Sequence, residues 1–105
     1  MSDVLWQKYG LSEANGQRVS DVLSLFGEVH EAILFGSRAK GNYKPGSDID
    51  LAVKGTISKD ILSKLLTAFE ESLLPYFVDV VVYGNIRNEA LREHIDRVGV
   101  SIYQK

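Results

Sequence analysis

Residues 36–50 read GSRAKGNYKPGSDID and connect two apolar runs, residues 32–35 and residues 51–53, which both indicate buried strands. Asp48 and Asp50 stand two positions apart, so on an extended chain their side chains point to the same side. Two carboxylates held so close repel each other unless one is protonated or a cation lies between them. A hard divalent cation such as Mg²⁺ prefers oxygen ligands of this kind.

The front of this stretch has the chemistry of a phosphate site. Gly36 carries no side chain, so a ligand can approach the backbone there, and Ser37 can begin a short helix with its N–H groups and hydroxyl facing outward. Arg38 is the basic residue best placed to contact phosphate. Ser47 can contact phosphate or serve only the turn. Together with the aspartates, these residues indicate a nucleoside triphosphate bound through its phosphates and a metal ion.

A third carboxylate, Asp79, interrupts a run of strong β-formers at residues 77–82. That run has the pattern of a central, buried strand, in which a lone carboxylate is costly unless it is paired or binds a metal. We expect this strand to lie beside the one that begins at Ile49, so that Asp79 faces Asp48 and Asp50. The three aspartates would then form a two-metal site, in which Asp79 can also accept the proton of an attacking hydroxyl.

Ordinary structural roles are the alternatives for these residues. The aspartates can cap turns or point to water from an edge strand, and the Gly-Ser pair can form a plain strand-to-helix turn with a capping serine. The histidines, His30 and His94, lack metal-ligand spacing, and His94 is predicted to be structural. The joint occurrence of the Gly-Ser pair and three aspartates favours the functional interpretation.

The periodicity of the remaining chain predicts a small α+β domain with a two-layer arrangement. The first two strands are expected to be antiparallel neighbours, because only a short link joins them. We predict one domain over residues 1–105, a small mixed β-sheet with helices packed mainly on one face. Helices are predicted from Ser12 to about Phe26, from Ser58 to Pro75 with Leu73 on the apolar stripe, and from Asn88 to Gly99; strands are predicted at 31–35, 49–53, 76–83 and 100–103.

Composition narrows the functional class. The chain has 105 residues, a formal net charge of −2 and no cysteine, which excludes disulfides and thiolate metal sites and gives no support to general nucleic-acid binding. No basic start and apolar run of a signal peptide is present, and no apolar run has the length that a bilayer requires. We expect a cytoplasmic protein without direct nucleic-acid or membrane contact, whose small site is completed by another chain.

Gly36 and Ser37, followed after ten residues by the Asp-Ile-Asp sequence and later by Asp79, resemble the DNA polymerase β-type nucleotidyltransferase superfamily. The resemblance spans about residues 31–83. It implies that the three aspartates hold two Mg²⁺ ions and that the Gly-Ser turn holds the triphosphate of ATP. The chain is most similar to the minimal nucleotidyltransferase (MNT) proteins, which pair with helical HEPN proteins as antitoxin and toxin.

This resemblance implies an antitoxin that transfers AMP from ATP to a tyrosine of a HEPN-type toxin, with which it can form a hetero-oligomer. Two alternatives stay open. The chain can neutralise its partner by binding alone, with an idle or regulatory nucleotide site. It can also modify a small molecule such as an aminoglycoside, with a second subunit completing the pocket.

Overall fold

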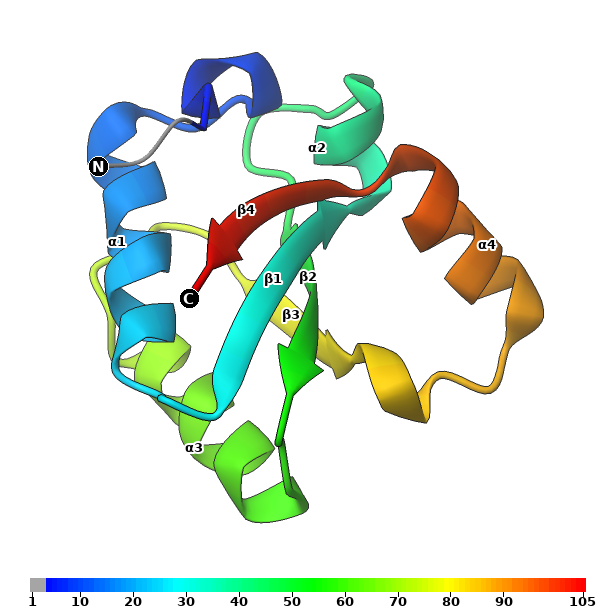
Figure 1. The fold of residues 1–105 in the computed structure, drawn as a ribbon. Coiled ribbons are helices and arrows are strands. Elements are labelled where there is room, and N and C mark those ends of the chain that lie inside the picture. Colours follow the sequence, from blue (N-terminus) through cyan, green and yellow to red (C-terminus); the bar gives the residue numbers. More distant parts are fainter. Residues whose placement is uncertain (1–3) are drawn as a thin grey trace.

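The computed structural model describes residues 4–105, which form helices around a four-stranded sheet (Figure 1). The strands lie in the order β3-β2-β1-β4; β1 is antiparallel to β2 and β4, and β3 is parallel to β2. The predicted small mixed sheet is thereby confirmed. The elements are η1 (Trp6–Tyr9), α1 (Glu13–Ser24), β1 (Val29–Phe35), α2 (Gly36–Lys40), β2 (Ile49–Gly55), α3 (Lys59–Glu70), β3 (Val78–Val82), η2 (Tyr83–Asn85), α4 (Glu89–Val98) and β4 (Val100–Gln104).

Short polar side chains begin the three long helices, as predicted. Ser12, Ser58 and Asn88 each accept a hydrogen bond from the backbone N–H three residues later, at 3.1–3.2 Å. Each bond satisfies an amide that no helical carbonyl can reach. The capping residues therefore set where α1, α3 and α4 begin.

The end of α3 differs from the prediction. The helix ends at Glu70, and Leu73, which was predicted for its apolar stripe, is 80% exposed in the connection to β3. The hydroxyl of Ser72 donates to the carbonyl of Phe69 at 2.6 Å, and the Ser72 N–H donates to the same carbonyl. This local bonding ends the helix five residues before Pro75.

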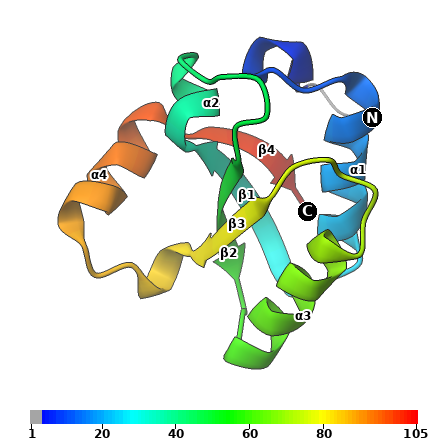
Figure 2. The same cartoon turned by 180° about the vertical axis from the view of Figure 1, so that it is seen from behind.

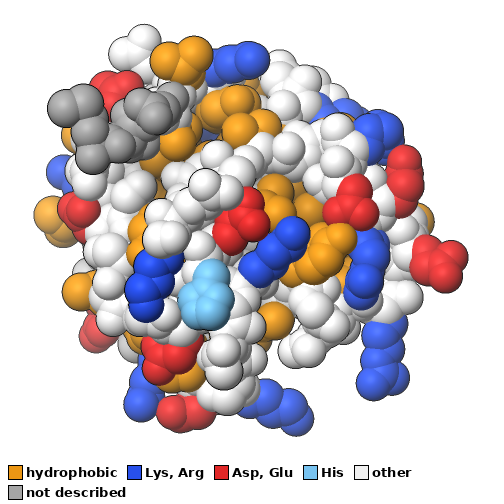
Figure 3. Space-filling view, in the orientation of Figure 1, with side chains coloured by type: hydrophobic (Ala, Val, Ile, Leu, Met, Phe, Trp, Pro, Cys, Tyr) orange, Lys and Arg blue, Asp and Glu red, His pale blue; other side chains and the backbone are white. Residues whose placement is uncertain are grey.

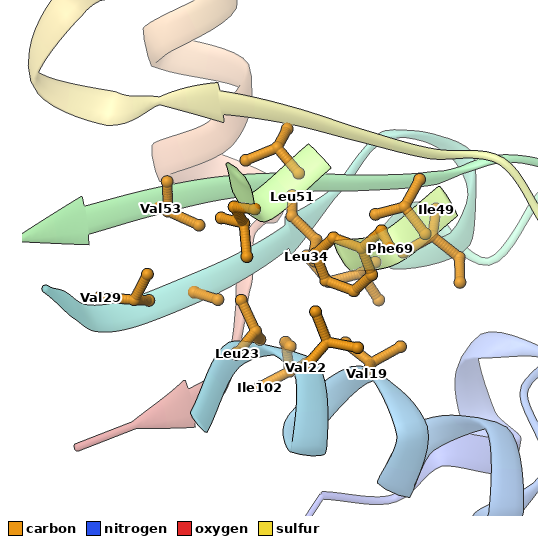
Figure 4. Packing of buried hydrophobic residues seen from close by; sticks show 14 of the residues in the cluster. Val19, Val22, Leu23, Val29, Leu34, Ile49, Leu51, Val53, Phe69 and Ile102 are labelled. Carbon is orange, nitrogen blue, oxygen red and sulfur yellow. The ribbon is translucent and has the colours of Figure 1, made fainter. Parts of the chain in front are cut away.

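Helices α1 and α3 cover one face of the sheet, and α4 packs against the other (Figures 1 and 2). The predicted bias towards one face is confirmed, because the larger core lies under α1 and α3. The smaller cluster beneath α4 contains Phe35, Ala52 and Ile95. The larger core includes Val19, Val22, Leu23, Val29, Leu34, Ile49, Leu51, Val53, Phe69 and Ile102 (Figure 4).

Strand β3 lies at an edge of the sheet, so the prediction of a central, buried strand was wrong. Its apolar character has another cause. Val78 and Val80 are each 5% exposed in the larger core, whereas Asp79 between them is exposed on the other face. Asp79 is therefore not a buried carboxylate, and its importance depends on which residue lies beside it.

The segment before α1 packs on the domain through its buried aromatic residues, Trp6 and Tyr9. Trp6 is 2% exposed, and its indole lies against Gly16, where an added Cβ would overlap the ring. A glycine in the first turns of α1 is thus explained by packing and not by helix propensity.

The charges on the surface agree with the small net charge of the chain, and the helices agree with its lack of a long apolar run. On the face seen in Figure 3, acidic and basic side chains are interspersed and do not form one large patch of a single sign. Within residues 4–105, every helix is too short or too polar to cross a lipid bilayer.

Candidate active site

Asp50 and Asp79 lie side by side on neighbouring parallel strands. The register pairs Asp50 of β2 with Asp79 of β3, and Ala52 with Val81 two residues further on. Paired residues of adjacent strands point to the same face, which here is the face that α4 packs against. The structure thus brings these two predicted site residues together, as expected.

Asp48 directly precedes β2 and is exposed two positions before Asp50. Burial raises the pKa of the half-buried Asp50 carboxyl, and the negative charges of Asp79 and then Asp48 raise it further. His94 and Arg38 act in the opposite direction and lower the pKa of this carboxyl. The three aspartates therefore interact electrostatically around Asp50, although they come from different parts of the chain.

The chemistry of these side chains fits a divalent cation. Three mutually repelling carboxylates supply the oxygen ligands that Mg²⁺ prefers, and a cation among them would relieve their repulsion. Their side chains are not preassembled: within residues 4–105, no group of three or more His, Cys, Asp or Glu side chains has the arrangement of a metal site. The fit therefore rests on donor chemistry, and the binding of two Mg²⁺ ions stays a prediction.

Gly36 forms the bend between β1 and α2, directly against Asp50. Its φ of 76° lies in the left-handed region, and an added Cβ would overlap the Asp50 carboxylate oxygen Oδ2. Glycine is therefore required both for the backbone conformation and for the close approach of the carboxylate. Ser37 follows in the first turn of α2, where backbone N–H groups lack helical carbonyl partners. The Gly-Ser turn and the aspartates thus form one site.

His94, which is predicted from the sequence to be structural, contacts the Gly36 bend of this site. Its Nε2 accepts a hydrogen bond from the Gly36 N–H at 3.2 Å, and its ring packs edge-on against Phe35, with ring centroids 6.1 Å apart. The two hydrogen-bonded residues are 58 positions apart in the chain. The available sequence signal was its place next to Ile95 on α4, which does not reveal what a helix contacts.

Arg38 is buried, at 2% exposure, and its guanidinium donates to backbone carbonyls. Nε and Nη2 donate to the carbonyl of Ser47 at 3.1 and 2.7 Å. Nη1 donates to the carbonyls of Tyr9 and Gly10 at 2.9 and 3.2 Å. These bonds tie the connection between α2 and β2 to the N-terminal segment. They favour a structural role, and the expected contact of Arg38 with phosphate stays a prediction.

Ser47 stabilises the turn before the aspartates. Its Oγ accepts from the Lys44 N–H at 2.8 Å, and its N–H donates to the Lys44 carbonyl at 3.0 Å. The rings of Tyr43 and Tyr76 flank the Arg38 guanidinium, at 5.5 and 4.7 Å from its central carbon. The turn role predicted as one alternative for Ser47 is therefore observed, and its contact with phosphate is untested.

A groove of about 220 Å³ extends from the end of α3 along β3 to Asp79. Phe77 at its rim is 61% exposed, a large fraction for a phenylalanine. The lining is mainly apolar and consists of Leu66, Phe69, Glu70, Leu74, Tyr76, Phe77, Val78 and Asp79. An apolar surface therefore reaches one of the three aspartates.

Comparison with known protein families matches residues 17–105 to the family described as "Polymerase beta, Nucleotidyltransferase". The probable protein adenylyltransferase MntA of Haemophilus influenzae is 42% identical over 73 residues, which are 68% of this chain and 63% of that protein. The matched part thus spans less than two thirds of this relative.

Several chains of solved structures have a fold similar to that of this chain. A chain of a toxin–antitoxin complex with AMP-PNP superposes with a TM-score of 0.71 at 21% identity, covering 87% of this chain and 74% of that chain. A complex of tri-AMPylated HEPN toxin with MNT antitoxin from Shewanella oneidensis gives 0.60 at 19%, covering 90% and 74%. A putative nucleotidyltransferase from Sulfolobus solfataricus gives 0.57 at 23%, covering 95% and 83%. These likenesses confirm the predicted fold class.

Proposed function

Because the chain belongs to the polymerase beta nucleotidyltransferase family, we propose that it transfers AMP from ATP to a hydroxyl group of a protein partner. The observation that carries the proposal is the pairing of Asp50 with Asp79 directly beside the Gly36 bend. This places acidic side chains and a side-chain-free backbone turn at one position. The proposed reaction needs the turn for the triphosphate, and it needs the acidic side chains for the metal ions and the attacking hydroxyl.

In this proposal the Gly36-Ser37 turn binds the phosphates of ATP, and Arg38 and Ser47 support the turn or contact phosphate. Asp48, Asp50 and Asp79 would hold two Mg²⁺ ions, which when bound would neutralise charge on the triphosphate. The acceptor oxygen bonds to the α-phosphorus, and the bond from that phosphorus to pyrophosphate breaks. The hydroxyl proton passes to the Asp79 carboxylate. Positioning and charge stabilisation supply most of the rate enhancement.

The proposed acceptor is a tyrosine of a HEPN-type toxin. In this proposal the chain is the antitoxin, and it acts in the cytoplasm. The relative from H. influenzae is named a protein adenylyltransferase, and the S. oneidensis structure pairs an MNT antitoxin with an AMPylated HEPN toxin. Asp79 is exposed on an edge strand, where a hydroxyl on another protein can reach it.

The groove beside Asp79 is the proposed contact surface for this HEPN-type partner. It is continuous with the site, and its exposed Phe77 offers the apolar area that a protein interface buries. A protein acceptor therefore fits this open edge better than a small molecule such as an aminoglycoside, which would need a second subunit to enclose it.

The proposal is tested by incubating the chain with its HEPN-type partner and Mg-ATP and measuring the mass of the partner. We expect the mass increase of AMP with the natural chain and none with Asp79→Asn. Asp60→Asn is the matched control, because Asp60 is an exposed aspartate at the start of α3 whose side chain is 73% exposed. An adduct that persists with Asp79→Asn would contradict the role of this carboxylate.

Toxin neutralisation that survives replacement of both Asp48 and Asp50 by asparagine would instead support an antitoxin that acts by binding alone. Transfer of label from ATP to small acceptors, in the absence of the partner, would support the small-molecule alternative.

A further inference from the structure

The backbone N–H of Gly36 donates to a side chain that lies 58 positions later in the chain. His94 of α4 accepts this hydrogen bond through Nε2 at 3.2 Å. The ring is held by its edge-on contact with Phe35, the residue directly before the bend. His94 therefore contacts both sides of the connection between β1 and α2.

This contact acts on the most constrained position of the site. Gly36 has a left-handed backbone with a φ of 76°, and Asp50 Oδ2 lies where its side chain would be. The bend must therefore hold its orientation for the carboxylate to stay beside it. An N–H bonded to a side chain of α4 restricts rotation of the peptide that enters the bend. Because the Gly36 N–H is already bonded, the N–H and hydroxyl of Ser37 are the donors through which the bend can contact a phosphate.

We propose that His94 is a positioning residue that holds the Gly36 bend against Asp50 and thereby sets the affinity of the site for a nucleoside triphosphate. The inference rests on the proposed function for its ligand, but its structural part concerns only the protein. His94 acts through Gly36 and is not assigned to the reacting atoms. Helix α4 thus becomes a part of the site.

Two substitutions separate the hydrogen bond from packing. His94→Phe keeps a ring against Phe35 and removes the acceptor. His94→Gln supplies an acceptor oxygen without the ring. The matched control is His30→Phe, because His30 is exposed near the start of β1, whereas the bend follows the last residue of that strand.

The first measurement is amide hydrogen exchange of Gly36 by NMR, without nucleotide. We expect faster exchange of this amide in His94→Phe, partial recovery in His94→Gln and no change in His30→Phe. The second is calorimetric binding of AMP-PNP with Mg²⁺. We expect His94→Phe to weaken binding about three- to tenfold, the effect of one lost hydrogen bond, with partial recovery in His94→Gln. Recovery by the acceptor distinguishes positioning from a general loss of stability.

Unchanged AMP-PNP affinity in His94→Phe would overturn the inference, even if the variant were less stable. Tighter binding would also overturn it, because His94 would then compete with phosphate for the Gly36 N–H. These outcomes differ from failure of the proposed function, in which the natural chain itself binds no AMP-PNP. That result would remove the nucleotide from both proposals, whatever the exchange rate of Gly36.

Discussion

The Asp50 carboxylate occupies the space that a side chain on Gly36 would need. The backbone that follows the end of β1 thereby packs against a carboxylate from the start of β2. No room is left at Gly36 for even a methyl group. This contact explains why the Gly-Ser pair and the Asp-Ile-Asp sequence belong together, although ten residues separate them. The contact also makes several measurements informative.

Gly36→Ala is expected to lower both stability and nucleotide affinity. The alanine Cβ would meet Asp50 Oδ2, and a φ of 76° is strained for any residue with a side chain. We expect a loss of about 1–3 kcal/mol in the free energy of unfolding, measured with urea. Gly84→Ala is the control, because a Cβ there meets no atom within 4 Å. Equal stability of the two variants would contradict the observed packing.

Asp79→Asn is expected to lower the pKa of Asp50. Burial is the largest cause of the raised pKa of Asp50, and the charge of Asp79 is the next. Removing that charge leaves the effect of burial and of Asp48. Carbon-detected NMR titration of the Asp50 carboxyl in both proteins measures the difference, with Asp60→Asn as the control. An unchanged Asp50 titration would show that the two carboxylates do not interact.

The same pKa shift predicts how stability depends on pH. A carboxyl whose pKa is raised in the folded state binds its proton more tightly than in the unfolded chain, so its protonation favours folding. The contribution of Asp50 is therefore favourable at acidic pH and is lost as the pH rises through its folded pKa, above the ordinary value of 3.8. Urea unfolding across this range should show a smaller loss in Asp79→Asn than in the natural chain.

Added Mg²⁺ is expected to raise the melting temperature, because a cation bound among the aspartates stabilises the folded state and relieves their repulsion. The rise should be smaller in Asp48→Asn and in Asp79→Asn than in Asp60→Asn. Sodium chloride at the same ionic strength controls for screening. A chelator should abolish AMP transfer. An equal rise in all variants would place the bound ion elsewhere.

Phe77→Ser is expected to weaken binding of the HEPN-type partner by about tenfold or more, the scale of an aromatic residue at the centre of an interface. Affinity for AMP-PNP should not change, because Phe77 faces the groove. Leu25→Ser is the control: Leu25 is 73% exposed and Phe77 61%, and Leu25 lies at the end of α1. If both variants bind the partner as the natural chain does, the contact surface lies outside this groove.

Much of the fold was predictable because its signals are local. Capping by Ser12, Ser58 and Asn88 set the helix starts, and short apolar runs marked the strands. The end of α3 was missed because Ser72 bonds back to Phe69, a competition between side chain and helix that periodicity does not register. The edge position of β3 was missed because valines facing one core give the same pattern as a strand buried on both faces.

The site was predictable only in part, because several of its contacts join residues that are far apart in the sequence. The neighbourhood of Asp50 and Asp79 followed from a topology that resembles a known family, and the register confirms it. The contact of His94 with Gly36 depends on where the last helix docks, which no local pattern fixes. The burial of Arg38 depends on carbonyls of the N-terminal segment, far from it in sequence.

The short spacing between α4 and β4 ties the final strand to the helix that carries His94. Gly99 alone separates the two elements, and β4 pairs with β1, whose last residue precedes the glycine bend. A substitution that loosens the pairing of β4 with β1 is therefore expected to shift the helix that carries His94. Such a variant is expected to lose nucleotide affinity although Asp48, Asp50 and Asp79 are all unchanged.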